Sequence, residues 1–233
     1  TLLNDVFGFN NFRPGQGEII DAVTSGENVL AIMPTGGGKS LCFQLPALLN
    51  DGLTVVISPL IALMRDQVRG LQAAGVAAGA ITSGNTQEET NTVFSQIGSC
   101  DLKLLYVAPE RLNSSRIQNI LRKSNVNSIA VDEAHCVSQW GHDFRPDYLN
   151  IGKLRRSLGV PLSAFTATAD NDTQQEIIER LFDGVTPKTF LRGFDRPNIF
   201  LSFVPKDKPR SQIMDFVQRR KGQSGIVYCG TRA

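Results

Sequence analysis

Residues 33–40 place three consecutive glycines, a lysine and a serine directly after a short apolar run. The run, Val29–Ile32, has the composition of a buried strand, and the MPTGGGKS sequence that follows is typical of a phosphate-binding loop that opens a helix. Consecutive glycines let backbone N–H groups turn inward around a phosphate without a Cβ clash. Lys39 supplies a cation for the β- and γ-phosphates, and the Ser40 hydroxyl is a candidate Mg²⁺ ligand. The segment therefore predicts a strand–loop–helix unit that binds a nucleoside triphosphate.

The loop departs from the strict pattern at one position. That pattern has glycine six residues before the lysine, where this chain has Met33. A glycine-rich turn that only caps a helix is the alternative interpretation. The loop residues expected to contact the nucleotide are Pro34, Thr35, Gly36, Gly37, Gly38, Lys39 and Ser40.

Two adjacent carboxylates follow a second apolar run. Residues 128–131 predict a short strand that ends in Asp132-Glu133-Ala134-His135. Neighbouring carboxylates at a strand tip are costly unless a cation lies close to them. Asp132 is placed to hold Mg²⁺, and Glu133 to orient and deprotonate the water that attacks the γ-phosphate. The alternative is an acidic helix N-terminus, in which both carboxylates complement the helix dipole.

Composition and charge bound the class of protein. The 233 residues are 41% apolar and 20% charged, enough for one core and the beginning of a second domain. We expect a soluble, intracellular protein, because no apolar run approaches the roughly 18 residues of a membrane span and the N-terminus carries no signal segment. The cysteines are too scattered for a zinc site or a secreted disulfide framework, and we expect reduced, mostly buried thiols at Cys42, Cys100, Cys136 and Cys229.

The charge is unevenly distributed along the chain. Residues 192–233 carry nine Lys/Arg and three Asp/Glu, a local charge of +6, whereas the whole chain carries +2. A basic C-terminal segment suits contact with a nucleic-acid backbone. A solvated linker followed by an exposed helix face explains the same charges.

Strand-like and helix-like segments alternate, which predicts a doubly wound parallel sheet. Segments with helical spacing, such as 60–71 and 173–182, separate the strands. Ligands of such sheets bind at the carboxyl ends of the strands, where both motifs fall. The predicted strands are 28–32, 53–57, 77–81, 103–107, 127–131, 161–165 and 187–191.

A polar, proline-interrupted segment marks a predicted domain boundary. We expect a first domain at 1–191, a linker at 192–198 and the incomplete start of a second domain at 199–233. The second part predicts a strand at 199–204, a helix at 210–220 and a strand at 225–229.

Together these motifs resemble the RecQ family of superfamily 2 DNA helicases, most of all its bacterial branch. The resemblance implies two RecA-like domains of the P-loop NTPase class, the second cut off early. The segment FGFNNFRPGQ at 7–16 is similar to the family's adenine-recognition motif. It implies that Phe9 stacks on the base, that Arg13 packs nearby and that the Gln16 amide reads the adenine edge. Most relatives have tyrosine where this chain has Phe9.

Further motifs imply contacts with DNA. SPLIALMRDQV at 58–68 and APERL at 108–112 are similar to motifs Ia and Ib, which implies roles for Ser58, Pro59, Arg65 and Arg111 on single-strand phosphates. SQWGHDFRP at 138–146 resembles the aromatic-rich loop peculiar to the family, in which Trp140, Phe144 and Arg145 meet bases and report DNA to the hydrolytic site. The alternative places Trp140 and Phe144 in the core.

Two more segments complete the resemblance. FTATAD at 165–170 looks like motif III, so His135, Thr166 and Thr168 are expected to couple hydrolysis to domain movement. IVYCGTR at 226–232 resembles the start of motif IV, with Gly230 and Thr231 in place of the usual Asn-Ser. The later motifs with the arginine finger have no counterpart here.

The resemblance implies an ATP- and Mg²⁺-dependent motor that tracks one DNA strand 3′ to 5′ and unwinds duplexes in repair and recombination. The expected partners are single-stranded and branched DNA, without a membrane, and the expected state is a monomer in the bacterial cytoplasm, associated with the nucleoid. A chain of this length is expected to unwind little or nothing by itself. The alternatives are a truncated ATP- or DNA-binding module without catalysis and a DEAD-box-like RNA helicase.

Overall fold

A computed structural model describes residues 1–139, 143–192 and 199–228. The chain divides into two compact units, Thr1–Phe194 and Asp195–Ala233, and each is described by itself. The predicted aromatic residue Trp140 lies outside the described residues.

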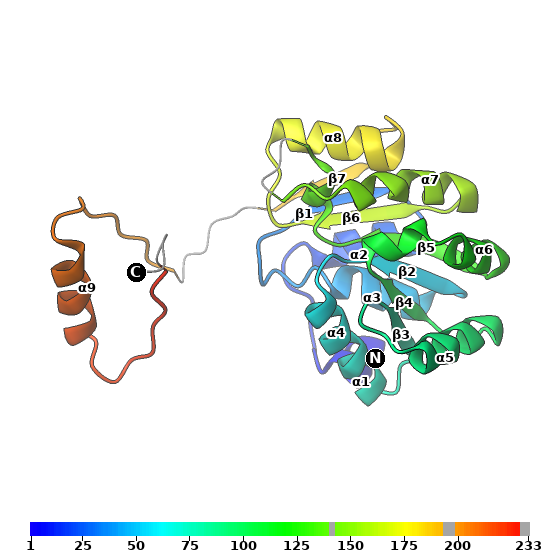
Figure 1. Cartoon of the computed structure of the whole chain (residues 1–233), viewed down its shortest axis with the longest axis horizontal. Coiled ribbons are helices and arrows are strands. Elements are labelled where there is room, and N and C mark those ends of the chain that lie inside the picture. The colour runs from blue at the N-terminus through cyan, green and yellow to red at the C-terminus, as the bar shows by residue number, and fades with distance from the viewer. Residues whose placement is uncertain (140–142, 193–198, 229–233) are drawn as a thin grey trace. The chain divides into compact units, whose positions relative to one another are not determined.

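The first unit is built on a seven-stranded sheet in which the strands pair in parallel, in the order β3-β4-β2-β5-β6-β1-β7 (Figure 1). All seven predicted strands are confirmed, each to within one residue at either end. The predicted doubly wound α/β class is therefore confirmed. The strands are β1 Val29–Ile32, β2 Leu53–Ile57, β3 Ala78–Ile81, β4 Leu104–Val107, β5 Val126–Val131, β6 Leu162–Thr166 and β7 Lys188–Leu191.

Helices cover both faces of this sheet because side chains of successive strand residues point to opposite sides. In β1, Leu30 and Ile32 join one apolar core, whereas Val29 and Ala31 join the other. The first core packs under α5 Gln87–Gly98, α6 Ser115–Lys123, α7 Leu149–Leu158 and α8 Asn171–Phe182. The second packs under α1 Leu2–Phe7, α2 Gln16–Thr24, α3 Leu41–Leu49 and α4 Ile61–Ala73.

Short 3-10 turns follow the strands that carry the predicted motifs. They are η1 Pro109–Asn113 after β4, η2 Ala134–Val137 after β5 and η3 Pro146–Tyr148 before α7. Within the described part of the chain, no helix is both long and apolar enough to cross a bilayer.

The second unit contains α9 Pro209–Gln218, which confirms the predicted helix. The strands predicted at 199–204 and 225–229 are wrong for the described residues, which adopt no strand there. A strand needs a hydrogen-bonded neighbour, and the large apolar side chains of these two segments are instead open to solvent. Phe200 is 92% exposed, Phe203 91% and Tyr228 90%.

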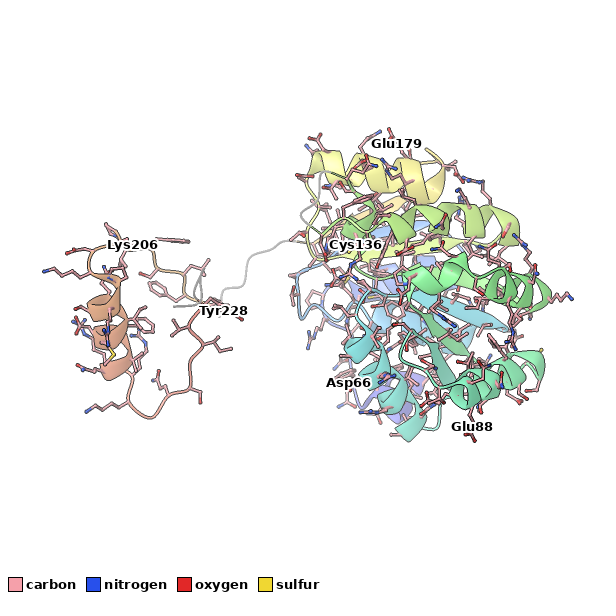
Figure 2. The ribbon with its side chains drawn as sticks, viewed as in Figure 1. Asp66, Glu88, Cys136, Glu179, Lys206 and Tyr228 are labelled. Carbon is pink, nitrogen blue, oxygen red and sulfur yellow. The ribbon has the colours of Figure 1, made fainter. Side chains whose placement is uncertain are left out.

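The thiols of the first unit differ sharply in burial. Cys42 and Cys136 are buried, and burial raises the pKa of each thiol to about 12, whereas Cys100 is exposed. Figure 2 shows Cys136 within the sheet unit. Since the thiolate is the reactive form, we expect a thiol reagent at pH 8 to label Cys100 quickly and the two buried cysteines only after unfolding. Mass spectrometry of the labelled peptides checks this, with a sample in denaturant as the control. Labelling of Cys42 or Cys136 at the rate of Cys100 in the native protein would contradict the described packing.

Candidate active site

The strand register brings four loop origins together at one edge of the sheet. Ile32 of β1 lies opposite Thr166 of β6, and Val131 of β5 lies opposite Ile57 of β2. Because β5 and β6 also pair, the carboxyl ends of β1, β6, β5 and β2 are neighbours (Figure 1). The predicted phosphate loop, motif III, the carboxylate pair and motif Ia all begin there.

The backbone of the phosphate loop explains its departure from the strict pattern. Met33 is buried, and its N–H donates to the Thr166 carbonyl at 2.9 Å, so it extends β1 instead of turning. The left-handed conformations fall on Gly36 and Gly38, with φ of 78° and 81°. At Gly37 a Cβ would approach the Pro34 carbonyl to 2.8 Å. The positions that need glycine here are occupied by glycine, and Met33 is not one of them.

A chain of polar side chains fixes the Ser40 hydroxyl. Gln67 of α4 donates to Ser40 Oγ at 3.1 Å, and Gln44 donates to Tyr106 at 2.8 Å and to Gln67 at 3.4 Å. Lys39 Nζ lies 3.5 Å from the Met33 carbonyl, folded over its own loop. No role was predicted for Gln44, Gln67 or Tyr106, because amide and phenol groups that packing brings together have no local sequence pattern.

The Asp132 carboxylate lies beneath this loop and is only 5% exposed. It accepts from Ser58 Oγ at 3.2 Å and from the Glu133 N–H at 3.0 Å, while Tyr148 donates to the Asp132 carbonyl at 2.9 Å. Burial raises the pKa of Asp132 and the Glu133 carboxylate raises it further, whereas Lys39 and the two hydrogen bonds lower it. A group with these opposing influences gains from a nearby cation.

Glu133 has an unusual backbone, with φ 48° and ψ 49° in the left-handed region. Its carboxylate lies 3.4 Å from His135 Nδ1, and the same nitrogen lies 2.9 Å from Thr166 Oγ1. Thr166 in turn donates to the Thr168 carbonyl at 2.9 Å. The structure thus brings four residues from two separate motifs into one connected group.

The predicted adenine segment also contacts the phosphate loop. Gln16 is 3% exposed, and its Nε2 donates to the carbonyls of Gly37 and Gly38 at 3.3 and 3.2 Å. Its Oε1 accepts from the Arg13 N–H at 2.8 Å, and the Arg13 guanidinium donates to the Gly36 carbonyl. The Phe9 ring is 50% exposed.

Oxygen donors at this edge suit one kind of metal ion. The Asp132 carboxylate and the Ser40 hydroxyl are hard ligands of the type that Mg²⁺ prefers. His135, Cys136 and Asp143 also cluster, with ligand atoms within 4.8 Å of one another. However, His135 Nδ1 faces Thr166, and burial raises the pKa of Cys136 to about 12, which disfavours the thiolate that a soft metal needs.

Among the residues expected to contact DNA, Ser58 is buried, whereas Arg65 and Arg145 bond to backbone carbonyls. Ser58 is buried against Asp132, so the structure places it with the carboxylates and away from the surface. Arg65 donates to the Gly84 carbonyl at 2.7 Å. Arg145 donates to the Pro59 carbonyl at 3.3 Å and pairs with Asp143, while the nearby Phe144 is half-buried. The end of the aromatic loop is thereby joined to motif Ia.

Arg111 lines a polar hollow of about 200 Å³ that the sequence analysis missed. The Arg111 Nε is buried without a partner among the described residues. The Arg116 guanidinium lies 4.7 Å above the Phe94 ring at the same hollow. The signal that could have found it is the hydroxyl-rich sequence directly after β3 and at the start of α6. These hydroxyls belong to Thr82, Ser83, Thr86 and Ser114.

The left-handed backbone at Glu133 predicts how substitutions at this position change the free energy of unfolding. A left-handed residue with a Cβ costs about 1–2 kcal/mol, and glycine avoids this cost while losing more entropy on folding. We therefore expect the free energy of unfolding of Glu133→Gly to exceed that of Glu133→Ala by about 0.5–1 kcal/mol. Urea unfolding measures both.

The matched control is Glu179, which is exposed on α8 (Figure 2). There glycine is expected to be less stable than alanine by about 1 kcal/mol. The same order of stability at both positions would mean that Glu133 carries no backbone strain.

Comparison with known proteins agrees with this geometry. The model of the DEAD/DEAH box helicase family matches residues 13–177. The chain is 48% identical over 233 residues to the ATP-dependent DNA helicase RecQ of Haemophilus influenzae, and 43% identical over 235 residues to that of Bacillus subtilis. Each alignment covers all of this chain, but only 38% and 40% of the relative.

Solved structures with low sequence identity share the fold. The DUF1998 helicase MrfA superimposes with a TM-score of 0.72 at 20% identity, over 98% of this chain and 38% of that one. A hypothetical ATP-dependent RNA helicase from Sulfolobus tokodaii gives 0.61 at 18% identity, over 79% of this chain and 54% of that one.

Proposed function

The chain belongs to the DEAD/DEAH box helicase family, with RecQ DNA helicases among its relatives, and from this we propose that it is the ATP-hydrolysing part of a 3′–5′ DNA helicase motor. The observation that carries the proposal is the convergence of the phosphate loop, the carboxylate pair and motif III at one edge of the sheet. The chain spans about 38% of the Haemophilus influenzae relative, so the unwinding activity is proposed for a longer protein.

Each residue of this edge has a distinct role in the proposed ATP hydrolysis. Lys39 and the N–H groups of the glycine loop bind the phosphates. Glu133 accepts a proton from the attacking water, while the bond between the γ-phosphorus and its bridging oxygen breaks. His135 contacts the Glu133 carboxylate, and Thr166 contacts His135, which connects the carboxylate to the loop after β6.

Asp132 and Ser40 would hold Mg²⁺, which neutralises phosphate charge when bound. The Asp132 carboxylate is already oriented by Ser58 and by the Glu133 N–H, and Ser40 by Gln67. These supporting bonds leave few other conformations to either donor, so little ordering remains when the ion binds.

For adenine selection, the Gln16 side chain must exchange its present hydrogen-bond partners for the base. The Gln16 amide is satisfied by Gly37, Gly38 and the Arg13 N–H. We propose that the incoming base takes over the donor and acceptor of Gln16 and that the exposed Phe9 ring stacks on it. The phosphate loop and the base site are then coupled, because the same amide serves both.

Single-stranded DNA is the proposed second ligand. The hollow offers the Arg111 guanidinium, whose Nε has no partner among the described residues, and the hydroxyls of residues after β3 and β4, which suit a phosphate of the backbone. Arg65, Pro59 and the half-buried Phe144 are proposed to extend this track, and the sequence motif alone proposes Trp140 as a further DNA contact. We propose a cytoplasmic location at the nucleoid, because the proposed substrate is chromosomal DNA. Residues 199–233 are proposed as the start of the second RecA-like domain, after a linker at 192–198.

Two substitutions test the hydrolytic assignment. Lys39→Ala is expected to weaken ATP binding at least tenfold, because a phosphate-binding charge is lost, whereas Glu133→Gln is expected to bind ATP normally and lose turnover. Calorimetry measures binding, and phosphate release with single-stranded DNA present, in the longer protein, measures turnover. Lys103→Ala, at the amino end of β4, is the control. Unchanged ATP affinity in Lys39→Ala, or equal loss of binding in both variants, would contradict the assignment.

Arg111→Ala tests the proposed DNA contact. If Arg111 meets one phosphate, its loss should weaken binding to oligonucleotides of every sequence and lower the slope of log affinity against log salt by about 1. Fluorescence anisotropy of a labelled oligonucleotide at several salt concentrations measures both. Arg122→Ala in the last turn of α6 is the control. An unchanged salt slope in Arg111→Ala would remove Arg111 from the DNA track.

A further inference from the structure

Arg192 links the carboxyl end of β7 to the start of α2. Its N–H donates to the Ile32 carbonyl at 2.9 Å, which continues the pairing of β7 with β1 to the residue before the phosphate loop. Its guanidinium pairs with Glu18 of α2 at 2.6 Å. Arg192 was expected only as the first residue of the linker, and it has no role in the proposed hydrolysis.

The Arg192 guanidinium packs directly on the backbone of Gly15. A Cβ at Gly15 would lie 2.2 Å from Nε and 2.5 Å from Cζ of Arg192. Gly15 also has φ of 83°, in the left-handed region, and is the N-cap of α2. Glycine is needed there both for the turn and for the contact with the flat guanidinium.

The turn that Arg192 supports is the one that faces the phosphate loop. The Gln16 N–H donates to the Arg13 carbonyl at 3.0 Å, and the Gln16 side chain accepts from the Arg13 N–H, so residues 13–16 form one hydrogen-bonded unit. On the loop side, Arg13 and Gln16 donate to Gly36, Gly37 and Gly38. Arg192 packs on Gly15, in the middle of the same unit.

The contact contributes little stability. Glu18 is 68% exposed and Arg192 34%, and ion pairs between exposed side chains stabilise a fold only weakly. The Arg192 Nε is buried and has no partner among the described residues, which destabilises the fold. Net stabilisation therefore does not account for the arrangement, whereas positioning of the turn does.

We infer that Arg192 is a positioning residue for base selection: it holds the turn at residues 13–16 so that Gln16 meets the base in one orientation. This rests on the proposed function. Without the guanidinium the turn gains freedom, and ATP loses more affinity than ligands that do not use Gln16. GTP and inorganic tripolyphosphate are such ligands, because the first presents a different base edge and the second has no base.

The test compares the affinities of ATP, GTP and tripolyphosphate for the 233-residue chain, by calorimetry with Mg²⁺. Arg192→Ala is expected to lower the ratio of ATP to GTP affinity about fivefold, equivalent to about 1 kcal/mol, and to lower tripolyphosphate affinity less than ATP affinity. Arg192→Lys, which keeps the charge without the planar group, should restore only part of the ratio. Lys188→Ala is the matched control, because it removes the 3.1 Å pair with Glu27 at the opposite end of β7.

Two results would overturn the inference. One is an unchanged ATP to GTP ratio in Arg192→Ala. The other is an equal loss of affinity for all three ligands, accompanied by a lower unfolding temperature, which would make Arg192 merely structural. Failure of the proposed function itself looks different, because the unsubstituted chain would then show no preference for ATP over GTP.

Discussion

The parallel pairing of β1 with β6 is the constraint on which the site depends. The ladder continues beyond β1 through the Met33 N–H to Thr166, so the first residue of the phosphate loop is fixed to the last residue of β6. That bond fixes the position of the glycine loop relative to the contact between His135 and Thr166. A shift of register by one residue would move every side chain of β1 to the other face and separate these groups.

Electrostatics then decides what this edge can bind. Burial and the neighbouring Glu133 both raise the pKa of Asp132, and Lys39 opposes them. The geometry holds two carboxylates beside a lysine and a loop of N–H donors, which suits a phosphate chain that arrives with its cation. Glu133 adopts a left-handed backbone conformation within this group. Strained backbone conformations of this kind are often found at functional sites.

Much of the fold followed from local patterns, because short apolar runs alternated with helical spacing and each run ended at turn-forming residues. The two strands predicted after residue 198 were wrong because a single apolar segment resembles a strand in sequence. Without a neighbouring strand, such a segment has no hydrogen-bonding partner. Within the site, glycines and adjacent carboxylates have a sequence pattern, so the positions of Lys39 and Asp132 at one edge of the sheet could be predicted, whereas their roles stay predictions.

The supporting residues had no such pattern. Gln67, Tyr148 and Arg192 reach the site from separate elements, and only the packed structure brings them to it. The surface role expected for Ser58 differs from its position for the same reason, since burial beside Asp132 depends on the neighbouring strand.

Hydrogen exchange measured by mass spectrometry tests the central claim most directly, namely that ATP and Mg²⁺ bind at the edge formed by β1, β5 and β6. The account predicts that adding both slows exchange in peptides covering residues 13–16, 33–40 and 132–138, while peptides from α5 exchange as before. Protection confined to other regions, or no change at 33–40 at saturating nucleotide, would contradict it.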